Sequence, residues 1–185
     1  GGLKYADLDG NGIITADDQD WIYNPVPAFS YGLNVSLTYK SFDMTMFWQG
    51  VYDQDVYNNQ KAQTDFWSIT DAGSNKGNRL LGAWNTNNTE STIPALTTNN
   101  TADEGRASSY YVENGSYLKL RNLQFGYTVP TSFLSKFKMS SARVYVSGQN
   151  LLTIKSKGLT CPDPENPNWN YPIATSVSFG LQIGF

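Results

Sequence analysis

Residues 7–18 carry oxygen-bearing groups at the spacing of a calcium-binding loop. Gly12 stands at loop position 6, where such a loop must turn sharply. Oxygen ligands are expected at loop positions 1, 3, 5, 7, 9 and 12, which are Asp7, Asp9, Asn11, Ile13 (through its main-chain carbonyl), Thr15 (directly or through water) and Asp18. Because Ca²⁺ takes about six to eight oxygen ligands, the pattern predicts a structural calcium site with a Kd of about 10⁻⁴–10⁻³ M.

Two features set this segment apart from a paired EF-hand. Position 12 is Asp18 rather than Glu, as is usual in dockerin-type loops, and residues 1–6 show no entering helix. Thr15 followed by Asp18 is a helix-start signal, so a short exit helix toward Trp21 is expected. The alternative is a turn rich in Asp, Asn and Gly that binds no metal.

The composition excludes several classes of function. Charged residues make up 16% of the 185 residues, below the roughly 25% of soluble domains, whereas aromatic residues reach 14%. A net charge of −3 without Lys/Arg runs argues against a nucleic-acid partner. The chain has no His, which removes the usual general base, and no Ser or Cys beside a credible base, so no enzyme is predicted. The single Cys161 cannot form an internal disulfide.

The elements that must position these residues are strands. In residues 176–185 every odd position is large and apolar, and every even position is Ser, Gly or Gln. This period of two predicts a strand with one apolar and one small polar face, of a length (about 9–11 residues) that crosses a membrane at a tilt. The terminal Phe185 resembles the aromatic assembly signal of outer-membrane barrels. The last strand of a soluble β-sandwich also alternates and is the alternative.

The same alternation recurs upstream. Residues 29–52 predict a hairpin with a very short turn at Lys40-Ser41, in which Phe47 alone breaks the pattern, and its aromatic residues Tyr31, Tyr39, Phe42 and Trp48 are expected near strand ends. Strands are also predicted at 117–127, with a bulge near Asn122, and at 143–154. No stretch approaches the roughly 18 apolar residues of a membrane-spanning helix. The prediction is therefore an all-β fold of about five antiparallel strands joined alternately by short and long connections.

The long connections, 53–116 and 155–175, are predicted to be irregular. The first is rich in Asn, Thr, Ser and Gly and contains Trp67 and Trp84, which could stack on sugar rings but are more often packed within their own loop. The second contains four prolines, and Asp163 and Glu165, which flank Pro164, are expected to be solvated carboxylates.

Several ordered motifs together resemble the SusC/RagA family of TonB-dependent outer-membrane transporters. They are Lys4–Gly12, Asn24–Leu33, Tyr39–Asp43, Phe47–Gly50, Tyr110–Leu118, Leu120–Leu123, Val144–Leu151 and Phe179–Leu181. The resemblance covers nearly the whole chain except the loops 53–109 and 155–170. It implies a transmembrane β-barrel of about 22 strands with an N-terminal plug, of which this chain would be a C-terminal fragment of about a fifth.

The resemblance also implies partners and a location. It predicts import of glycans, oligosaccharides or peptides across the outer membrane of Bacteroidota, with a SusD-type surface lipoprotein and with energy from the TonB complex, which would contact a segment outside this chain. The expected organisation is a calcium-type loop and short helix (1–28), the hairpin (29–52), an extracellular loop (53–116), two strands (117–154), a second loop (155–175) and the terminal strand (176–185).

Two other functions remain open from the sequence. A secreted calcium-binding β-module for adhesion or carbohydrate binding shares the alternating strands and the calcium-type loop. It does not account for strands of membrane-crossing length, the alternation of short and long connections, or the terminal aromatic residue. A soluble glycan hydrolase ranks last because no paired-carboxylate signal is present.

Overall fold

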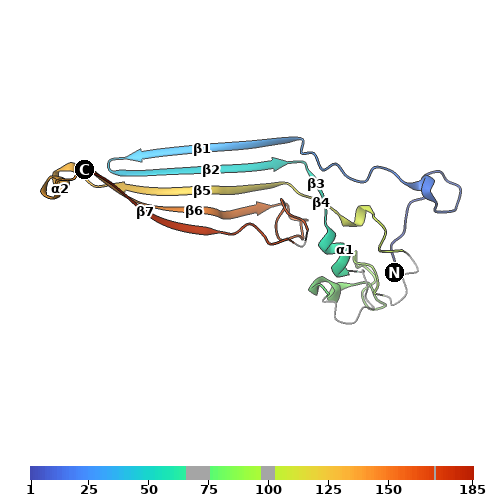
Figure 1. The fold of residues 1–185 in the computed structure, drawn as a ribbon. Helices are drawn as coiled ribbons and strands as arrows, with labels where there is room; N and C mark the ends of the chain where they lie inside the picture. Colours follow the sequence, from blue (N-terminus) through green and yellow to red (C-terminus); the bar gives the residue numbers. More distant parts are fainter. Residues whose placement is uncertain (66–75, 97–102, 169) are drawn as a thin grey trace.

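A single long antiparallel sheet dominates the computed structural model, which describes residues 1–65, 76–96, 103–168 and 170–185 (Figure 1). Within these residues the sheet has five strands in the order β1-β2-β5-β6-β7. Their bounds are β1 Phe29–Tyr39, β2 Phe42–Tyr52, β5 Tyr117–Thr128, β6 Ser141–Lys155 and β7 Ser176–Gly184. The all-β prediction is confirmed, and the sheet is open at β1 and β7 rather than closed on itself.

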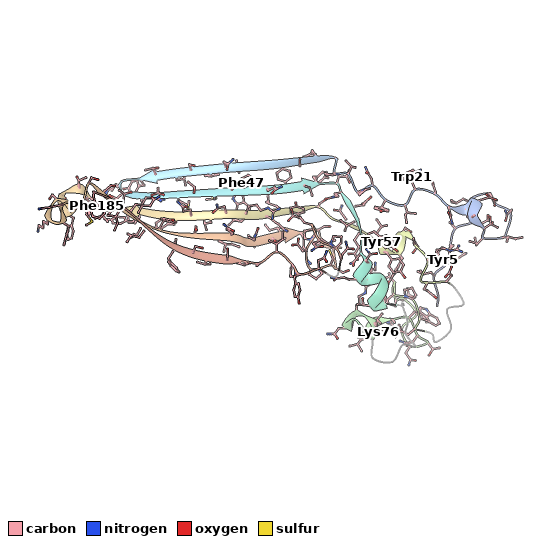
Figure 2. The ribbon with its side chains drawn as sticks, in the orientation of Figure 1. Tyr5, Trp21, Phe47, Tyr57, Lys76 and Phe185 are labelled. Carbon is pink, nitrogen blue, oxygen red and sulfur yellow. The ribbon has the colours of Figure 1, made fainter. Side chains whose placement is uncertain are left out.

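The connections separate by length to the two ends of the sheet. At one end β1 turns into β2 through Lys40 and Ser41, and β5 leads to β6 through α2 (Thr131–Leu134) and a 3₁₀ turn (Ser135–Phe137). The two long connections, β2 to β5 and β6 to β7, lie at the opposite end (Figure 1). Figure 2 places Phe185 at the first end and Trp21, Tyr57 and Lys76 beyond the second. The predicted alternation of short and long connections is therefore present.

The sheet has one apolar and one polar face. Because side chains alternate along a strand, residues paired in register share a face. One row across all five strands is entirely apolar: Leu37, Met44, Phe125, Val146 and Phe179. The next row is entirely polar: Ser36, Thr45, Gln124, Ser147 and Ser178. The apolar face is largely exposed in this chain, with Phe179 reaching 85%.

A bulge keeps the apolar face continuous along β5. Against β2 the register shifts so that the consecutive residues Phe47 and Trp48 pair with Asn122 and Leu120. Arg121 is the extra residue, and without it Leu118 and Leu120 would point to the opposite face from Phe125. The predicted bulge is confirmed. The exception Phe47 lies on the polar face, where its ring covers Gly32.

Aromatic residues gather at both ends of the hairpin on the apolar face. At one end the ring of Phe42 lies 4.8 Å from that of Tyr127, and at the other Phe29 lies 5.2 Å from Tyr52. Trp48 pairs with Leu33 and Leu120 between these clusters, where its indole donates to the sulfur of Met46, so the expectation of a strand-end position fails for this residue.

The connection 53–116 contains regular structure that the sequence did not predict. Its described part holds a two-stranded sheet of β3 (Asp55–Tyr57) and β4 (Val112–Asn114), the helix α1 (Asn59–Asp65), and 3₁₀ helices at Asn78–Gly82 and Ser109–Tyr111. The expectation of an irregular loop was wrong for these residues. Strands of three residues are too short to show a period in sequence. None of the described helices is both long and apolar enough to span a membrane.

Candidate functional site

An ion pair crosses the polar face of the sheet. Asp43 on β2 accepts hydrogen bonds from Nε of Arg143 on β6 at 3.0 Å and from its Nη2 at 2.5 Å. The two residues reach one another across Gly126 of β5, which stands between their strands. A Cβ atom at Gly126 would lie 2.5 Å from Arg143 Nη2 and 2.6 Å from Asp43 Oδ1. A glycine at this position is therefore what lets the two charges meet.

A second charged cluster lies nearer the end with the long connections. Lys119 of β5 is 2% exposed, and its ammonium donates to Asp163 Oδ1 at 2.7 Å and to Glu165 Oε2 at 2.5 Å. Glu165 also accepts hydrogen bonds from Tyr117 Oη at 2.6 Å and from Arg121 Nη2. Thus three β5 side chains on the polar face converge on two carboxylates of the connection between β6 and β7. We call Tyr117, Lys119 and Arg121 the cationic wall.

Asp163 is thus buried, and the expectation from sequence was wrong for this residue, whereas Glu165 is exposed as expected although it is ion-paired. Asp163 is 6% exposed and also accepts the main-chain N–H of Glu165, which closes a tight turn. Burial alone would raise the pKa of both carboxyls. Hydrogen bonds and charge from Lys119 outweigh it and hold the pKa of both below their ordinary values.

The connection between β6 and β7 makes a second set of contacts near its start. Glu113 of β4 accepts hydrogen bonds from the main-chain N–H and the hydroxyl of Thr160, both at 2.8 Å, and from Asn58 Nδ2 at 3.0 Å. Beside it, Val56, Leu159 and Cys161 form a buried apolar cluster. Burial raises the pKa of Glu113, but these hydrogen bonds lower it below its ordinary value overall.

Of these charged groups, only Asp163 and Glu165 were singled out from the sequence, and neither was paired with a cation. The available signal was that Lys119 and Arg121 are cations on a strand whose other polar-face residues are mostly neutral amides and hydroxyls. The partners lie 44 to 46 residues away in a proline-rich loop, and nothing in the local pattern pairs them.

The calcium-type loop brings together three of its expected ligands. Among the described residues, the carboxylate oxygens of Asp7, Asp9 and Asp18 lie within 4.8 Å of one another. Gly12 adopts a φ of +82°, as the sharp turn requires. Asn11 Oδ1 accepts the N–H of Ile13, and the Thr15 hydroxyl accepts that of Asp17. Oxygen donors of this kind are the ligand type that Ca²⁺ prefers.

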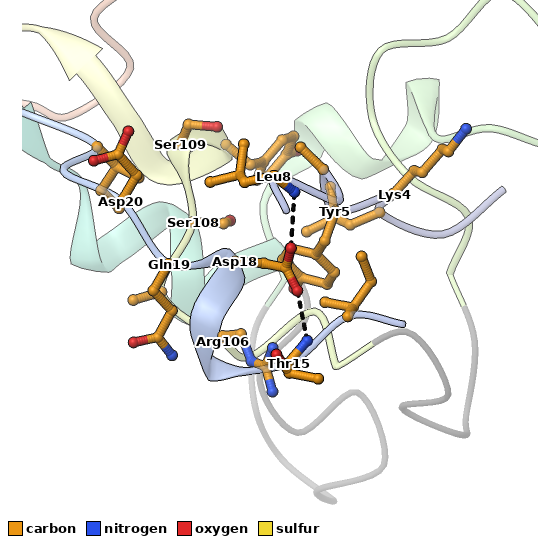
Figure 3. A pocket seen from close by; sticks show the side chains of 16 residues that line it. Lys4, Tyr5, Leu8, Thr15, Asp18, Gln19, Asp20, Arg106, Ser108 and Ser109 are labelled. Carbon is orange, nitrogen blue, oxygen red and sulfur yellow. Dashed lines mark hydrogen bonds between the residues drawn. The ribbon is translucent and has the colours of Figure 1, made fainter. Parts of the chain in front are cut away.

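Asp18 organises the loop. Its two carboxylate oxygens accept the N–H groups of Thr15 and Leu8, each at 2.7 Å (Figure 3). The Thr15 N–H bond is the largest cause of a lowered pKa of Asp18. Thr15 and Asp18 form a reciprocal capping box for a 3₁₀ helix at Ala16–Asp18, so the predicted exit helix is present as a single turn that ends before Trp21.

A cavity of about 550 Å³ lies between this loop and residues 106–110 (Figure 3). Apolar side chains such as Leu3, Leu8 and Ile14 line it together with Asp18 and Arg106. The guanidinium of Arg106 lies 5.6 Å from the ring centre of Tyr5 and pairs with Asp103. The lining therefore combines apolar side chains with charged groups.

The remaining sequence-predicted residues are spread apart. Trp84 is half-buried, and its indole lies against Gly1. Trp67 lies outside the described residues. Phe185 is almost fully exposed at the end of the sheet away from the long connections (Figure 2).

The fold and its two-faced sheet are those of a wall segment of an antiparallel β-barrel. No family model matches the chain. TonB-dependent receptor P3 of Formosa agariphila is 37% identical over all of this chain and 17% of its own length. TonB-dependent receptor SusC of Bacteroides thetaiotaomicron is 30% identical over 98% of this chain and 17% of its own length.

Solved structures give the same result for the fold. The RagAB peptide importer in its open-open state has a TM-score of 0.74 at 24% identity, over 97% of this chain and 20% of that one. A RagAB peptide transporter structure gives 0.71 at 25% identity, over 94% and 19%. The chain belongs to the family of TonB-dependent receptors that includes SusC, and it spans about a fifth of the length of these relatives.

Proposed function

We propose that this chain is part of an outer-membrane importer. Its apolar face contacts lipid, its polar face lines the interior of the barrel, and the end with the long connections faces the cell exterior. The observation that carries the proposal is the largely exposed row of apolar side chains that runs unbroken across all five strands of the main sheet in the described residues. Such a face has no stable place in water but matches the outer band of a membrane barrel.

The proposal extends to the working complex. The whole protein imports glycans, oligosaccharides or peptides across a Bacteroidota outer membrane, with a SusD-type lipoprotein at its mouth and the TonB complex as the energy source. The names of the relatives, TonB-dependent receptors and the RagAB peptide importer, support this assignment. We expect no catalytic activity. Phe185 serves as the assembly signal, and sugar stacking by Trp84 or Trp67 stays a prediction.

We further propose that residues 7–18 bind Ca²⁺ as a structural ion, with ligands from Asp7, Asp9 and Asp18 and with Asn11, Ile13 and Thr15 completing the shell. The convergence of three carboxylates within 4.8 Å supports this, because carboxylate oxygens are the ligand type that Ca²⁺ prefers. A secreted calcium-binding β-module stays the alternative function, but it gives no reason for the exposed apolar face.

A charge-insertion pair tests the membrane placement. In the full-length receptor, Phe179→Lys puts an ammonium on the apolar face, and Ser178→Lys puts the same group on the polar face of the same strand. A lysine toward lipid costs about 2–4 kcal/mol near the midplane, whereas one toward an aqueous interior costs little. We expect Phe179→Lys to lower the amount of heat-modifiable barrel in outer membranes severalfold and Ser178→Lys to leave it unchanged. The reverse order, or equal effects, would contradict the proposal.

A further inference from the structure

We propose that the cationic wall is a binding site for carboxylate-bearing solutes, and that the chain's own Asp163 and Glu165 occupy it. This inference rests on the proposed function in one respect, namely that the polar face lines the path of the solute. The site itself is defined by contacts within this chain. Its ligand class follows from the present occupant, which is a pair of carboxylates one residue apart.

The wall is built to receive carboxylates. Lys119 is almost completely buried, and its ammonium donates hydrogen bonds to both Asp163 and Glu165. Tyr117 Oη and Arg121 Nη2 both donate to the other oxygen of Glu165. Gln49 and Asn150 hold Arg121 in place, since their side-chain oxygens accept from its Nε at 2.9 Å and its Nη1 at 3.3 Å. A guanidinium fixed in this way is oriented before any ligand arrives.

The charges balance only while the loop is docked. Lys119 and Arg121 contribute two positive charges, and Asp163 and Glu165 contribute two negative ones. When the carboxylates leave, two cations remain on the polar face. In contrast, Arg143 further along the sheet keeps its partner Asp43 on a neighbouring strand and stays neutralised. The cationic wall is therefore the place on the described polar face where movement of a loop exposes positive charge.

The contacts that Asp163 and Glu165 make with the cationic wall are of a kind that an anion can replace. The apolar cluster that anchors this connection ends at Cys161, before Pro162. Beyond it, the docking contacts are the ion pairs of Asp163 and Glu165, the hydrogen bond from Tyr117 to Glu165, the burial of Pro164, and hydrogen bonds from Asn59 and Gln60 to Asn168. Glu113 and Thr160 keep the preceding residues in place. The carboxylate segment can thus leave the wall without unfolding its anchor.

The occupant competes strongly because it is tethered. A segment on a short connection has an effective concentration in the millimolar range, so a free carboxylate solute must overcome that advantage. Removing the charges of the occupant while leaving the wall intact should therefore raise the apparent affinity for such a solute. Removing the wall should abolish the gain.

The test uses the full-length receptor purified in detergent and the peptide tetraglutamate as probe, with tetraglutamine as the neutral control probe. Asp163→Asn with Glu165→Gln removes the occupant's charges at nearly constant shape. We expect tetraglutamate to bind this variant at least tenfold more tightly than the parent by calorimetry, and less tightly at high salt. Tetraglutamine should bind the charge-removed variant and the parent with the same affinity. Adding Arg121→Gln should remove the gain.

Matched controls exclude a general charge effect. Asp17→Asn with Glu90→Gln makes the same change in net charge at exposed carboxylates away from the wall and should leave the affinity unchanged. Glu165→Gln alone keeps the turn that Asp163 closes and should give a smaller gain in affinity for tetraglutamate. This single variant replaces the double variant in the test if the double variant does not fold. Equal affinity of parent and charge-removed variants, an equal gain in the control, or a gain that survives Arg121→Gln would overturn the proposal. Because binding is measured without transport, loss of uptake alone would count against the proposed function and not against this site.

Discussion

Gly126 is the single residue on which the ion pair between Asp43 and Arg143 depends most directly. Gly126→Ala puts a methyl group into the space where the two charged groups meet, 2.5 Å from Arg143 Nη2. We expect the two charged side chains to move apart, because the methyl group takes the space in which they meet, and the barrel to lose the small stability that the pair contributes. Thermal unfolding of the full-length receptor in detergent measures the loss.

The matched control is Gly158→Ala, where a Cβ atom meets nothing within 4 Å. It should leave the midpoint of unfolding unchanged. If both variants unfold at the parent temperature, the close approach at Gly126 has no energetic weight.

The calcium-type loop gives a second prediction for single residues. Asp9→Asn removes one charge from the three converging carboxylates but keeps an oxygen at the same position. We expect calcium affinity, measured by calorimetry on the full-length receptor, to fall about tenfold or more, since ligand charge sets affinity in such loops. Asp17→Asn, which lies in the same segment outside the converging group, is the control and should bind as the parent does. No calcium-dependent heat in the parent would refute the site.

At the scale of elements, the strands of the main sheet were predictable because each is long enough to show its period of two. The bulge was predictable as well, because Leu120 and Leu123 break the alternation in a way that only an inserted residue repairs. The strands β3 and β4 were not predictable. They have three residues each and depend on Glu113 and on the buried Tyr111, whose partners lie far away in the chain. The contacts of the cationic wall were not predictable for the same reason, because its carboxylate partners lie 44 to 46 residues away in the chain.

Glu113 also makes the junction of β4 with the second long connection dependent on pH. Its pKa is lowered on folding, so its contribution to stability is fully present above the ordinary value of 4.5 and is lost as the pH falls through the lowered value. At pH 7, Glu113→Gln should speed hydrogen exchange at the Thr160 amide by the equivalent of about 1–3 kcal/mol, because a buried acceptor is lost. Below the lowered pKa the two proteins should converge.

Glu90→Gln, at an exposed loop carboxylate, serves as the control for this experiment. A difference between Glu113→Gln and parent that persists at a pH low enough to protonate Glu113 would show that the charge of Glu113 is not what holds the junction.

At the scale of the whole molecule, two kinds of unsatisfied surface occur together. The apolar face is exposed along its length, and in the described residues β1 and β7 each pair with one neighbour only. Unpaired strand edges and a large apolar face both promote association in water, whereas lipid accepts the apolar face but not the unpaired edges. The relatives are about five times longer, and their further chain can pair with the free edges of β1 and β7.

The 185-residue chain expressed alone should therefore not form a stable monomer in detergent-free buffer. We expect it to sediment as large aggregates, because 11-residue and 9-residue edge strands can add further copies without limit. Analytical ultracentrifugation after refolding, with and without Ca²⁺, measures this directly. A monodisperse soluble monomer of about 20 kDa that binds calcium would instead favour the secreted β-module. It would mean that the apolar face folds back on itself in water, which would remove the main support for placing that face in a membrane.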